Sequence, residues 1–241
     1  MAPATRTTMT RLSLIGLDAD DTLWHNEPHF QATQTRLREL LAPYAAREHI
    51  DAQLLAVERR NLAVYGYGVK GFTLSMIETA LAIADARLPA TSVAEILAWG
   101  REMMQHPVEA LPGVHDALAE LAQHASLVLI TKGDLFHQEA KLAASGLGEF
   151  FAGVEIVSEK TAETYRRAFQ RHGASAEQAV MAGNSVRSDV LPALEAGAHA
   201  AWIPYPLLWE LEAADAPTAH PRFRQLASIS ELAPWVALLT R

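Results

Sequence analysis

Residues 12–24 read LSLIGLDADDTLW, an apolar run that ends abruptly in three carboxylates. The apolar part, residues 12–17, is typical of a parallel strand that is buried on both faces. Two carboxylates about 4 Å apart repel each other by roughly 4 kcal/mol at an effective dielectric constant near 20. Folding alone therefore does not favour Asp18, Asp20 and Asp21 at this position, but a bound divalent cation would, because hard cations take oxygen ligands. The alternative is that these acids and the following threonine only cap a helix or a turn.

The chain after this stretch changes to a purely helical pattern. From residue 28 to about residue 104 we find helical periods and no convincing strand. Prolines separate or end several of the segments, as expected at helix boundaries. The expected helices span residues 30–44, 50–64, 72–86 and 92–104. Four helices with short links indicate a small helical bundle.

From residue 107 onward short apolar runs alternate with helical segments. We expect strands at 127–130, 154–157, 179–182 and 200–203, and helices at 114–124, 134–145, 162–172, 189–196 and, interrupted by a proline, 229–239. Such alternation predicts a parallel sheet with right-handed crossovers and helices on both faces. The predicted fold is therefore α/β: a three-layer, Rossmann-like core of residues 1–24 and 107–241, with residues 25–106 inserted as an α-helical bundle.

Composition narrows the possible partners. The 241 residues are half hydrophobic and one-fifth charged, as in an ordinary soluble globular protein. The formal net charge of −8 argues against nucleic-acid polymers, whose affinity comes from Lys and Arg meeting phosphates, whereas a small phosphorylated metabolite is compatible with it because a metal can supply positive charge. The chain has no cysteine, which excludes disulfides and thiolate metal sites and fits a cytoplasmic location. We expect no membrane span and a frayed, polar tail over residues 1–11.

Polar side chains follow each of the first four predicted strands. Because the carboxyl ends of parallel strands meet at one edge of the sheet, residues at these positions are expected to form one site. In chain order they are Asp18 and Asp20, then Thr131 and Lys132, then Ser158, Glu159 and Lys160, then Asn184, Ser185 and, one helical turn later, Asp189. Hydroxyl, amine and carboxylate groups thus gather where a ligand site of this fold is expected.

This arrangement resembles the haloacid dehalogenase superfamily over nearly the whole chain. The sequence DADDT at residues 18–22 is similar to the first motif of that family, DxDxT, with Asp21 where glycine is common. Thr131 corresponds to the second motif, Lys160 to the third, and GNSVRSD at residues 183–189 to the fourth. The helical insert resembles the helical type-1 cap of the phosphatase branch.

The resemblance implies a Mg²⁺-dependent phosphatase that hydrolyses a small phosphomonoester through an aspartyl-phosphate intermediate. Asp18 would be the nucleophile, and Asp20 would protonate the leaving alcohol and then activate water. Thr131, the backbone amide of Lys132 and the Lys160 ammonium would bind the phosphoryl group. The implied metal ligands are Asp18, Asp20 through its backbone carbonyl, Asn184 and Asp189. Asn184 stands where the family often has Asp, so Asp189 is the firmer acidic ligand.

Other functions on this fold remain open from the sequence. A phosphomutase or phosphotransferase would use nearly the same residues. A haloacid dehalogenase shares the aspartate nucleophile, but dehalogenases of the family lack the second aspartate, so Asp20 argues against that activity. A non-catalytic binding module usually lacks the nucleophile or the acid, and both are present. The substrate and the oligomeric state are not determined by the sequence.

Two further patterns have structural explanations. Residues 66–71, GYGVKG, match the dinucleotide fingerprint GxGxxG, but that fingerprint needs a preceding strand, and the preceding stretch is helical in pattern. We interpret these residues as a loop between helices. The neighbouring side chains that are candidates to contact the leaving group are Tyr65, Tyr67, Lys70 and Phe72.

The second pattern is the pair His25 and His29, which are four residues apart. Pro28 lies between them and makes regular helical spacing doubtful. We therefore favour surface or hinge positions for these histidines over a metal-binding pair.

Overall fold

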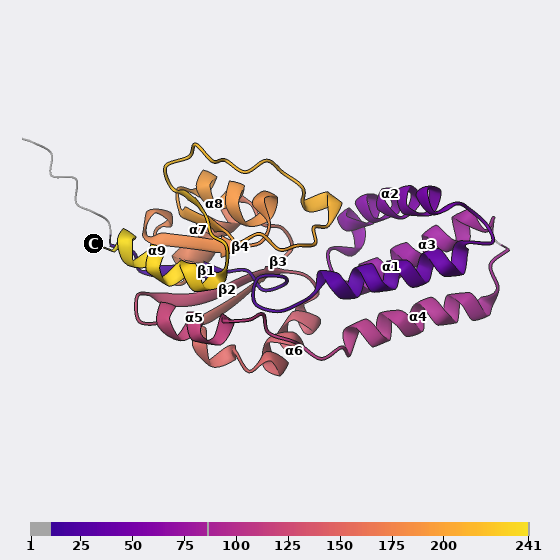
Figure 1. The fold of residues 1–241 in the computed structure, drawn as a ribbon, viewed down its shortest axis with the longest axis horizontal. Coiled ribbons are helices and arrows are strands. Elements are labelled where there is room, and N and C mark those ends of the chain that lie inside the picture. The colour runs from indigo at the N-terminus through magenta and orange to yellow at the C-terminus, as the bar shows by residue number, and fades with distance from the viewer. Residues whose placement is uncertain (1–10, 86, 241) are drawn as a thin grey trace, which may run out of the picture.

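The computed structural model describes residues 11–85 and 87–240. Over these residues the strands form one six-stranded parallel sheet in the order β3-β2-β1-β4-β5-β6 (Figure 1). The strands are β1 (Leu14–Leu17), β2 (Ser126–Lys132), β3 (Gly153–Val157), β4 (Ala179–Gly183), β5 (His199–Trp202) and β6 (Phe223–Gln225). Most of the tail expected at residues 1–11, and residue 86, where one helix is expected to end, lie outside the described residues.

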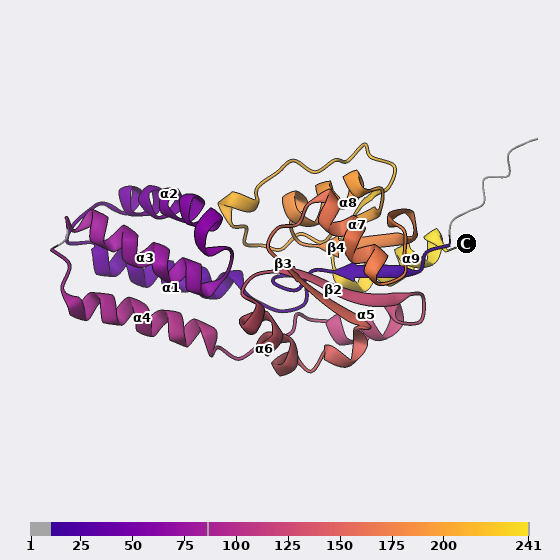
Figure 2. The same cartoon turned by 180° about the vertical axis from the view of Figure 1, so that it is seen from behind.

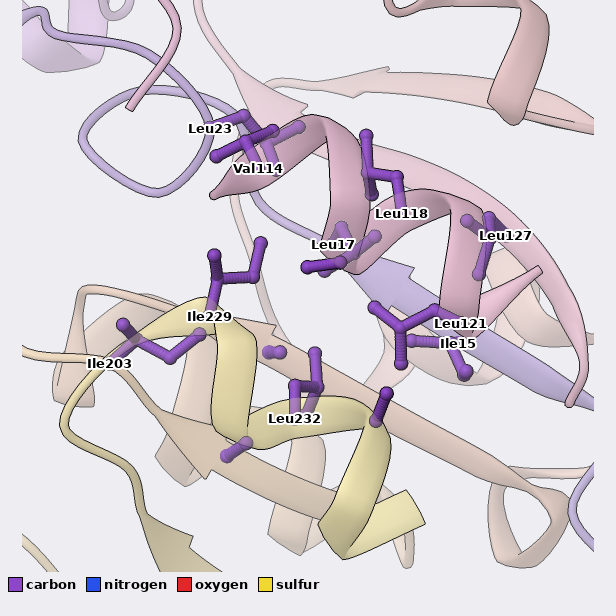
Figure 3. Close-up of a cluster of buried hydrophobic side chains, with 14 of the residues drawn as sticks. Ile15, Leu17, Leu23, Val114, Leu118, Leu121, Leu127, Ile203, Ile229 and Leu232 are labelled. Carbon is purple, nitrogen blue, oxygen red and sulfur yellow. The ribbon is translucent and has the colours of Figure 1, made fainter. Parts of the chain in front are cut away.

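Helices cover both faces of the sheet, which confirms the predicted three-layer α/β fold. On one face, α5 (Val114–Leu121) and α9 (Leu232–Leu239) pack against Ile15 and Leu17 of β1 (Figure 3). Leu142 of α6 (Leu135–Ser145) contacts the same cluster. On the other face, α7 (Ala162–Arg171) and α8 (Leu191–Ala196) share a second cluster with Leu14. Successive residues of β1 therefore point to opposite, equally apolar faces, which explains its continuous hydrophobic sequence.

Four helices between β1 and α5 form a bundle with its own core, here called the helical block. They are α1 (Glu27–Leu41), α2 (Arg47–Tyr65), α3 (Val69–Ile83) and α4 (Ala90–Met104). Their buried side chains include Leu37, Ile50, Met76 and Ile96. The block extends away from the sheet, and its near end lies beside α6 in both views (Figures 1 and 2). No helix among the described residues is long and apolar enough to cross a membrane.

Prolines account for two of the differences between the predicted and the observed helices. Helix α1 begins at Glu27 rather than at residue 30, because Pro28 lies in its first turn, where a backbone N–H has no helical acceptor. Pro234 occupies the first turn of α9 in the same way, so it does not interrupt that helix as predicted. Strand β6 and the segment of residues 203–222 before it, which is irregular apart from a 3-10 helix (Glu210–Glu212), were not predicted. Strand β6 has only three residues and is partly exposed.

The strand ends that carry the polar residues also differ slightly from the prediction. Strand β2 continues through Thr131 and Lys132, so these are its last residues rather than the first residues after it. After β4, a π-helical turn (Val186–Val190) precedes α8, whereas we expected a regular helix from Asp189. Both differences leave the polar side chains at the carboxyl edge of the sheet.

Candidate active site

The carboxyl edge of the sheet and the near end of the helical block enclose one cavity. Residues from the ends of β1, β2 and β4 and from the loop after β3 line it on the core side. The residues predicted to be catalytic, phosphate-binding or metal-binding are all in this lining: Asp18, Asp20, Thr131, Lys132, Lys160, Asn184 and Asp189. Of the other strand-end residues expected in the site, Ser185 is in the lining, whereas Ser158 and Glu159 are not. The topology alone therefore brings together groups that are up to 171 positions apart in the chain, from 18 to 189.

At the centre of the site the ammonium group of Lys160 lies between two carboxylates. Its Nζ is 2.5 Å from Oδ1 of Asp18 and 2.7 Å from Oδ1 of Asp189, and all three residues are buried. Burial lowers the pKa of Lys160, but the two carboxylates outweigh it and raise that pKa above its usual value. Burial raises the pKa of Asp18 to about 7; the Lys160 charge opposes this shift and the Asp189 charge adds to it. One ammonium therefore balances only one of the two negative charges.

The remaining carboxylate and amide oxygen atoms around Lys160 are of the kind that bind a metal cation. Oδ2 of Asp18 accepts a hydrogen bond of 3.1 Å from the Thr22 hydroxyl, which also lies 3.5 Å from Oδ1 of Asn184. Oδ2 of Asp189 accepts the amide N–H of Ser185 at 2.9 Å. The surplus negative charge and the hard oxygen donors fit a divalent cation such as Mg²⁺. The described residues contain no cluster of three or more His, Cys, Asp or Glu side chains placed for a metal; the candidate set consists of two carboxylates, an amide oxygen and a main-chain carbonyl.

Thr22 has a structural position that the sequence analysis did not assign. Besides its hydrogen bond to Asp18, its hydroxyl accepts the backbone N–H of Asn184 at 3.0 Å. It thereby joins the loop after β1 to the loop after β4, and it is almost fully buried. The sequence signal was its place at the end of the motif DxDxT.

Gly183, the last residue of β4, leaves room for the Asp189 carboxylate. A Cβ atom at Gly183 would lie far inside van der Waals contact with Oδ2 of Asp189. We expect Gly183→Ala to displace Asp189 and to cost about 1–3 kcal/mol of stability, as overpacking usually does, which corresponds to a fall of roughly 2–10 °C in the Tm measured by differential scanning calorimetry. Gly148→Ala is the matched control, because no atom lies within 4 Å of its added Cβ. An unchanged Tm for Gly183→Ala would contradict this packing.

Asp20 is held by three donors. Its carboxylate accepts hydrogen bonds from Nε1 of Trp24 at 2.7 Å, Nζ of Lys141 at 2.5 Å and Nε2 of Gln138 at 3.3 Å. Burial alone would raise the pKa of Asp20, but the Lys141 charge and these hydrogen bonds outweigh it and hold the pKa below its usual value. Asp20 is therefore ionised at neutral pH in this arrangement. Lys141 and Gln138 lie on α6, and the sequence analysis did not identify either of them.

The last two residues of β2 point in different directions. Thr131 is buried, and its hydroxyl accepts a hydrogen bond of 2.8 Å from Nε2 of Gln138. The Lys132 side chain instead extends to Glu212, with Nζ 2.7 Å from Oε1, and donates to the Ser188 hydroxyl at 2.8 Å. The Lys132 side chain is therefore not available to bind a phosphoryl group. The sequence-based prediction used only the backbone N–H of Lys132 for this role, together with the Thr131 hydroxyl.

Glu212 is a partly buried acid of the site that the sequence did not indicate. It lies in the segment of residues 203–222, and the hydroxyl groups of Ser185 and Ser188 each donate to its Oε2 at 2.5 Å. Burial alone would raise its pKa, but the charge of Lys132 and the hydrogen bonds keep that pKa below its usual value. In the sequence this segment shows neither helical nor strand periodicity, so nothing indicated that it returns to the site.

Asp21 shapes the turn that leads from β1 into the helical block. Its φ angle is 60°, in the left-handed region that Asp tolerates better than most residues, which is consistent with glycine being common there in the family that the motif resembles. Its carboxylate accepts the backbone N–H groups of Asn26 and Glu27 at 2.9–3.0 Å. Burial raises its pKa to about 7 despite these hydrogen bonds. The third acid of the motif therefore holds the start of α1.

The glycine-rich stretch lies between two helices, as expected, and no strand precedes it. Helix α2 runs to Tyr65 and α3 begins at Val69, so only residues 66–68 form the loop. Of the four nearby side chains proposed to contact the leaving group, Tyr67 and Phe72 line the cavity, whereas Tyr65 and Lys70 do not. Lys70 forms an ion pair of 2.9 Å with Asp134 of the core instead.

The two histidines do not form a metal-binding pair. Nδ1 of His25 lies 2.6 Å from the hydroxyl of Tyr205. The His29 ring packs against the ring of His106, with 3.7 Å between centroids. Their separate partners agree with the hinge or surface positions that the sequence favoured.

Comparison with known proteins identifies the family to which the chain belongs. Residues 12–197 match the model of the haloacid dehalogenase-like hydrolase family. The 5-amino-6-(5-phospho-D-ribitylamino)uracil phosphatase YigB of Escherichia coli is 26% identical over 208 residues, which cover 80% of this chain and 84% of that protein.

Solved structures agree with the sequence comparisons. A haloacid dehalogenase-like hydrolase from Xanthomonas campestris is 42% identical, with a TM-score of 0.85 and coverage of 98% of this chain and 95% of that chain. The HAD-hydrolase YfnB of Bacillus subtilis, solved with magnesium bound, is 19% identical with a TM-score of 0.64, covering 94% and 99% of the two chains. Haloacid dehalogenases are also similar in fold. With a family model that spans most of its length, this chain belongs to the haloacid dehalogenase-like hydrolase family of enzymes.

Proposed function

We propose that this enzyme is a Mg²⁺-dependent phosphatase that hydrolyses a small phosphomonoester through an aspartyl phosphate on Asp18. The observation that carries the proposal is the buried arrangement of Asp18, Lys160 and Asp189 with a second aspartate, Asp20, two residues after the first. The similarity to YigB, which is named as a phosphatase, supports it.

In the first step an oxygen of the Asp18 carboxylate attacks phosphorus, and the bond from phosphorus to the leaving oxygen breaks. The Lys160 ammonium, 2.5 Å from Asp18, stabilises the negative charge that gathers on the transferring phosphoryl group. The Thr131 hydroxyl and the Lys132 backbone N–H would hold the phosphoryl oxygens. In the second step water attacks phosphorus, which regenerates the Asp18 carboxylate and releases inorganic phosphate.

Asp20 would move the proton in both steps. It would protonate the leaving oxygen in the first step and accept a proton from the attacking water in the second. Its pKa is below the usual value without substrate, because Lys141 and three hydrogen bonds favour the carboxylate. A phosphate dianion next to Asp20 opposes this effect, since a second negative charge raises a carboxyl pKa. The same carboxyl group can therefore serve as acid with substrate bound and as base afterwards.

The cation would be held by Asp18, Asp189 and Asn184, with the main-chain carbonyl of Asp20. When bound, Mg²⁺ supplies positive charge to the phosphoryl oxygens as the transition state spreads charge over them. YfnB, with the same fold, was solved with magnesium. Asn184 in place of a carboxylate removes one negative charge from the set, so we expect weaker metal binding than with an aspartate there.

We also propose that residues 25–106 act as a cap over a core of residues 1–24 and 107–241. The contacts that join the block to the core include a hydrogen bond of 2.7 Å from the Tyr67 hydroxyl to Glu159 and the ion pair of Lys70 with Asp134. Such closure excludes water during phosphoryl transfer and admits a small molecule rather than a polymer. Without cysteine, the chain suits the reducing cytoplasm in which we expect its phosphorylated metabolite.

Two alternatives use the same site. A phosphotransferase would pass the phosphoryl group to an alcohol instead of water, and an added acceptor alcohol that yields a new ester would reveal it. A dehalogenase has no need of a proton donor for a departing halide, and the hydrogen-bonded Asp20 argues against it.

Phosphate release from an aryl phosphate tests the proposal. We expect turnover with Mg²⁺ and a loss of more than about 100-fold after EDTA treatment, because metal stabilisation of transition-state charge is worth several kcal/mol. Restoring Mg²⁺ should restore the rate, and the Asp18→Asn protein prepared in parallel controls for contaminating phosphatases. A folded protein that hydrolyses no phosphoester, or one that EDTA leaves unaffected, would refute the proposal as stated.

A further inference from the structure

Two buried glutamates line the cavity on the side of the helical block, and the proposed chemistry uses neither. Glu27 begins α1 and Glu58 lies in α2, and they are 9% and 8% exposed. Both are in the lining of the cavity that also contains Asp18. They lie close enough for the charge of Glu27 to raise the pKa of Glu58. The proposed phosphoryl site at Asp18 and this pair therefore border the same cavity, in which one ligand could contact both.

Neither glutamate has a cationic partner among the described residues, since none of the ion pairs found there includes Glu27 or Glu58. Glu27 accepts one hydrogen bond of 3.3 Å from Nε2 of Gln31. The indole of Trp209 near Glu58 favours its ionised form and partly offsets the rise in the pKa of Glu58 that burial causes. Burial raises the pKa of each glutamate to about 7. A buried carboxylate without a counter-charge is costly to the fold, so the pair is complementary to a positive group that the protein itself does not provide.

Asn61 is a second, independent observation in the same wall. It is 5% exposed and lines the cavity. Its Nδ2 donates to Ser75 and to Glu78, both at 3.1 Å. Because both donor hydrogens are used, the only hydrogen-bonding capacity left on this buried side chain is the acceptor oxygen Oδ1. This side of the cavity thus offers hydrogen-bond acceptors, which are complementary to a ligand with hydrogen-bond donors.

Aromatic side chains flank the same part of the cavity. The rings of Phe30 and Phe72 lie 4.9 Å apart between centroids, and both line the cavity together with Trp209. Trp209 belongs to the segment of residues 203–222, which reaches from the core to α2 (Figure 1). These surfaces suit the carbon skeleton of a leaving group, with its donor end at the glutamates.

We propose that Glu27 and Glu58 form a binding site for an amino group on the leaving alcohol, so that the substrate is a phosphomonoester of an amino alcohol. The inference rests on the proposed phosphatase function. A protonated amine supplies both the missing positive charge and several N–H donors, whereas a hydroxyl group supplies one donor and no charge. A purely alkyl group would leave both carboxylates buried without a partner.

The test is a series of ω-aminoalkyl phosphates of increasing chain length, each compared with the ω-hydroxyalkyl and alkyl phosphates of the same length. At the best length we expect the amino ester to exceed the alkyl ester at least about tenfold in kcat/KM, because losing one partner of a buried charge pair costs more than one tenfold step. A ratio near one at every length would overturn the proposal.

The variants Glu27→Gln and Glu58→Gln keep the shape of the side chain and remove its charge. We expect the ratio of amino to alkyl ester to fall toward one in the double variant; a ratio kept at its wild-type value would refute the site. Glu39→Gln and Glu48→Gln are matched controls on the same two helices, since both residues are exposed. The ratio is informative even if the absolute rates change.

Binding separates this inference from the phosphatase proposal. Calorimetric titration of the Asp18→Asn protein with the same esters measures the amino preference without turnover. Preferential binding of the amino ester by this variant, together with no hydrolysis of any ester by the wild-type protein, supports the glutamate site and overturns the phosphatase function. Hydrolysis of aryl and alkyl phosphates with no preference for the amino ester supports the phosphatase function and overturns the glutamate site.

Discussion

Asp18→Asn is expected to lower kcat for phosphoester hydrolysis by roughly 10⁴-fold or more, as loss of a covalent nucleophile does in other hydrolases. Asn keeps the size of the side chain and one oxygen but lacks the negative charge and the second oxygen that must attack phosphorus. The loss should appear in kcat for every leaving group, because all esters pass through the same aspartyl phosphate. Steady-state phosphate release with Mg²⁺ is the measurement.

The fold should survive this change. Burial raises the pKa of Asp18 from 3.8 to about 7, so in the metal-free protein this group costs stability progressively between these two pH values, and the full cost is present above pH 7. Asn carries no such charge, and we expect the Tm of Asp18→Asn in EDTA above pH 7 not to be lower than that of the wild type. Retained activity in the folded variant would exclude Asp18 as the nucleophile.

A second large loss of hydrolytic activity is expected for Asp20→Asn. Loss of general acid–base catalysis typically costs 10²–10⁴-fold, and the full loss should appear with alkyl phosphates, whose alkoxide is a poor leaving group. Nitrophenyl phosphate needs no protonation to leave, so its first step should be much less affected. Asn can still accept the hydrogen bond from the Trp24 indole that holds Asp20 at 2.7 Å, which limits rearrangement of the loop.

The comparison between the two ester classes is the decisive readout for Asp20. A larger loss in kcat/KM for the alkyl ester than for the nitrophenyl ester supports proton donation. Equal losses would mean that Asp20 acts only through the structure or through the metal. An alkyl ester that keeps its full rate would exclude the residue from the chemistry.

The sheet could be predicted from the sequence because its strands are buried on both faces. Residues 12–17 and 127–130 read as continuous apolar runs, since Leu14 meets the α7 and α8 side of the sheet while Ile15 and Leu17 meet α5 and α9. Helices between successive runs then force parallel pairing. With that topology, Thr131 and Asp189 had to lie at the same edge as Asp18.

The groups that surround Asp20 and Lys132 could not be predicted in this way. Lys141 lies in the interior of α6, and its sequence pattern shows only that it belongs to a helix, not that its ammonium reaches Asp20. Glu212 lies in the irregular segment of residues 203–222, whose path depends on tertiary packing rather than on local periodicity. The two glutamates of the helical block were missed for a related reason: which face of α1 and α2 borders the cavity is set by how the block packs on the core.

The most direct test of the central claim is to find the phosphoryl group on Asp18. In Asp20→Asn the activation of water is lost, so the aspartyl phosphate formed from nitrophenyl phosphate should accumulate during turnover. After acid quenching, mass spectrometry should show one added phosphoryl group on the peptide that contains Asp18, and none in the Asp18→Asn/Asp20→Asn protein. A phosphoryl group on another residue, or phosphate release by the Asp18→Asn enzyme at the wild-type rate, would contradict the account.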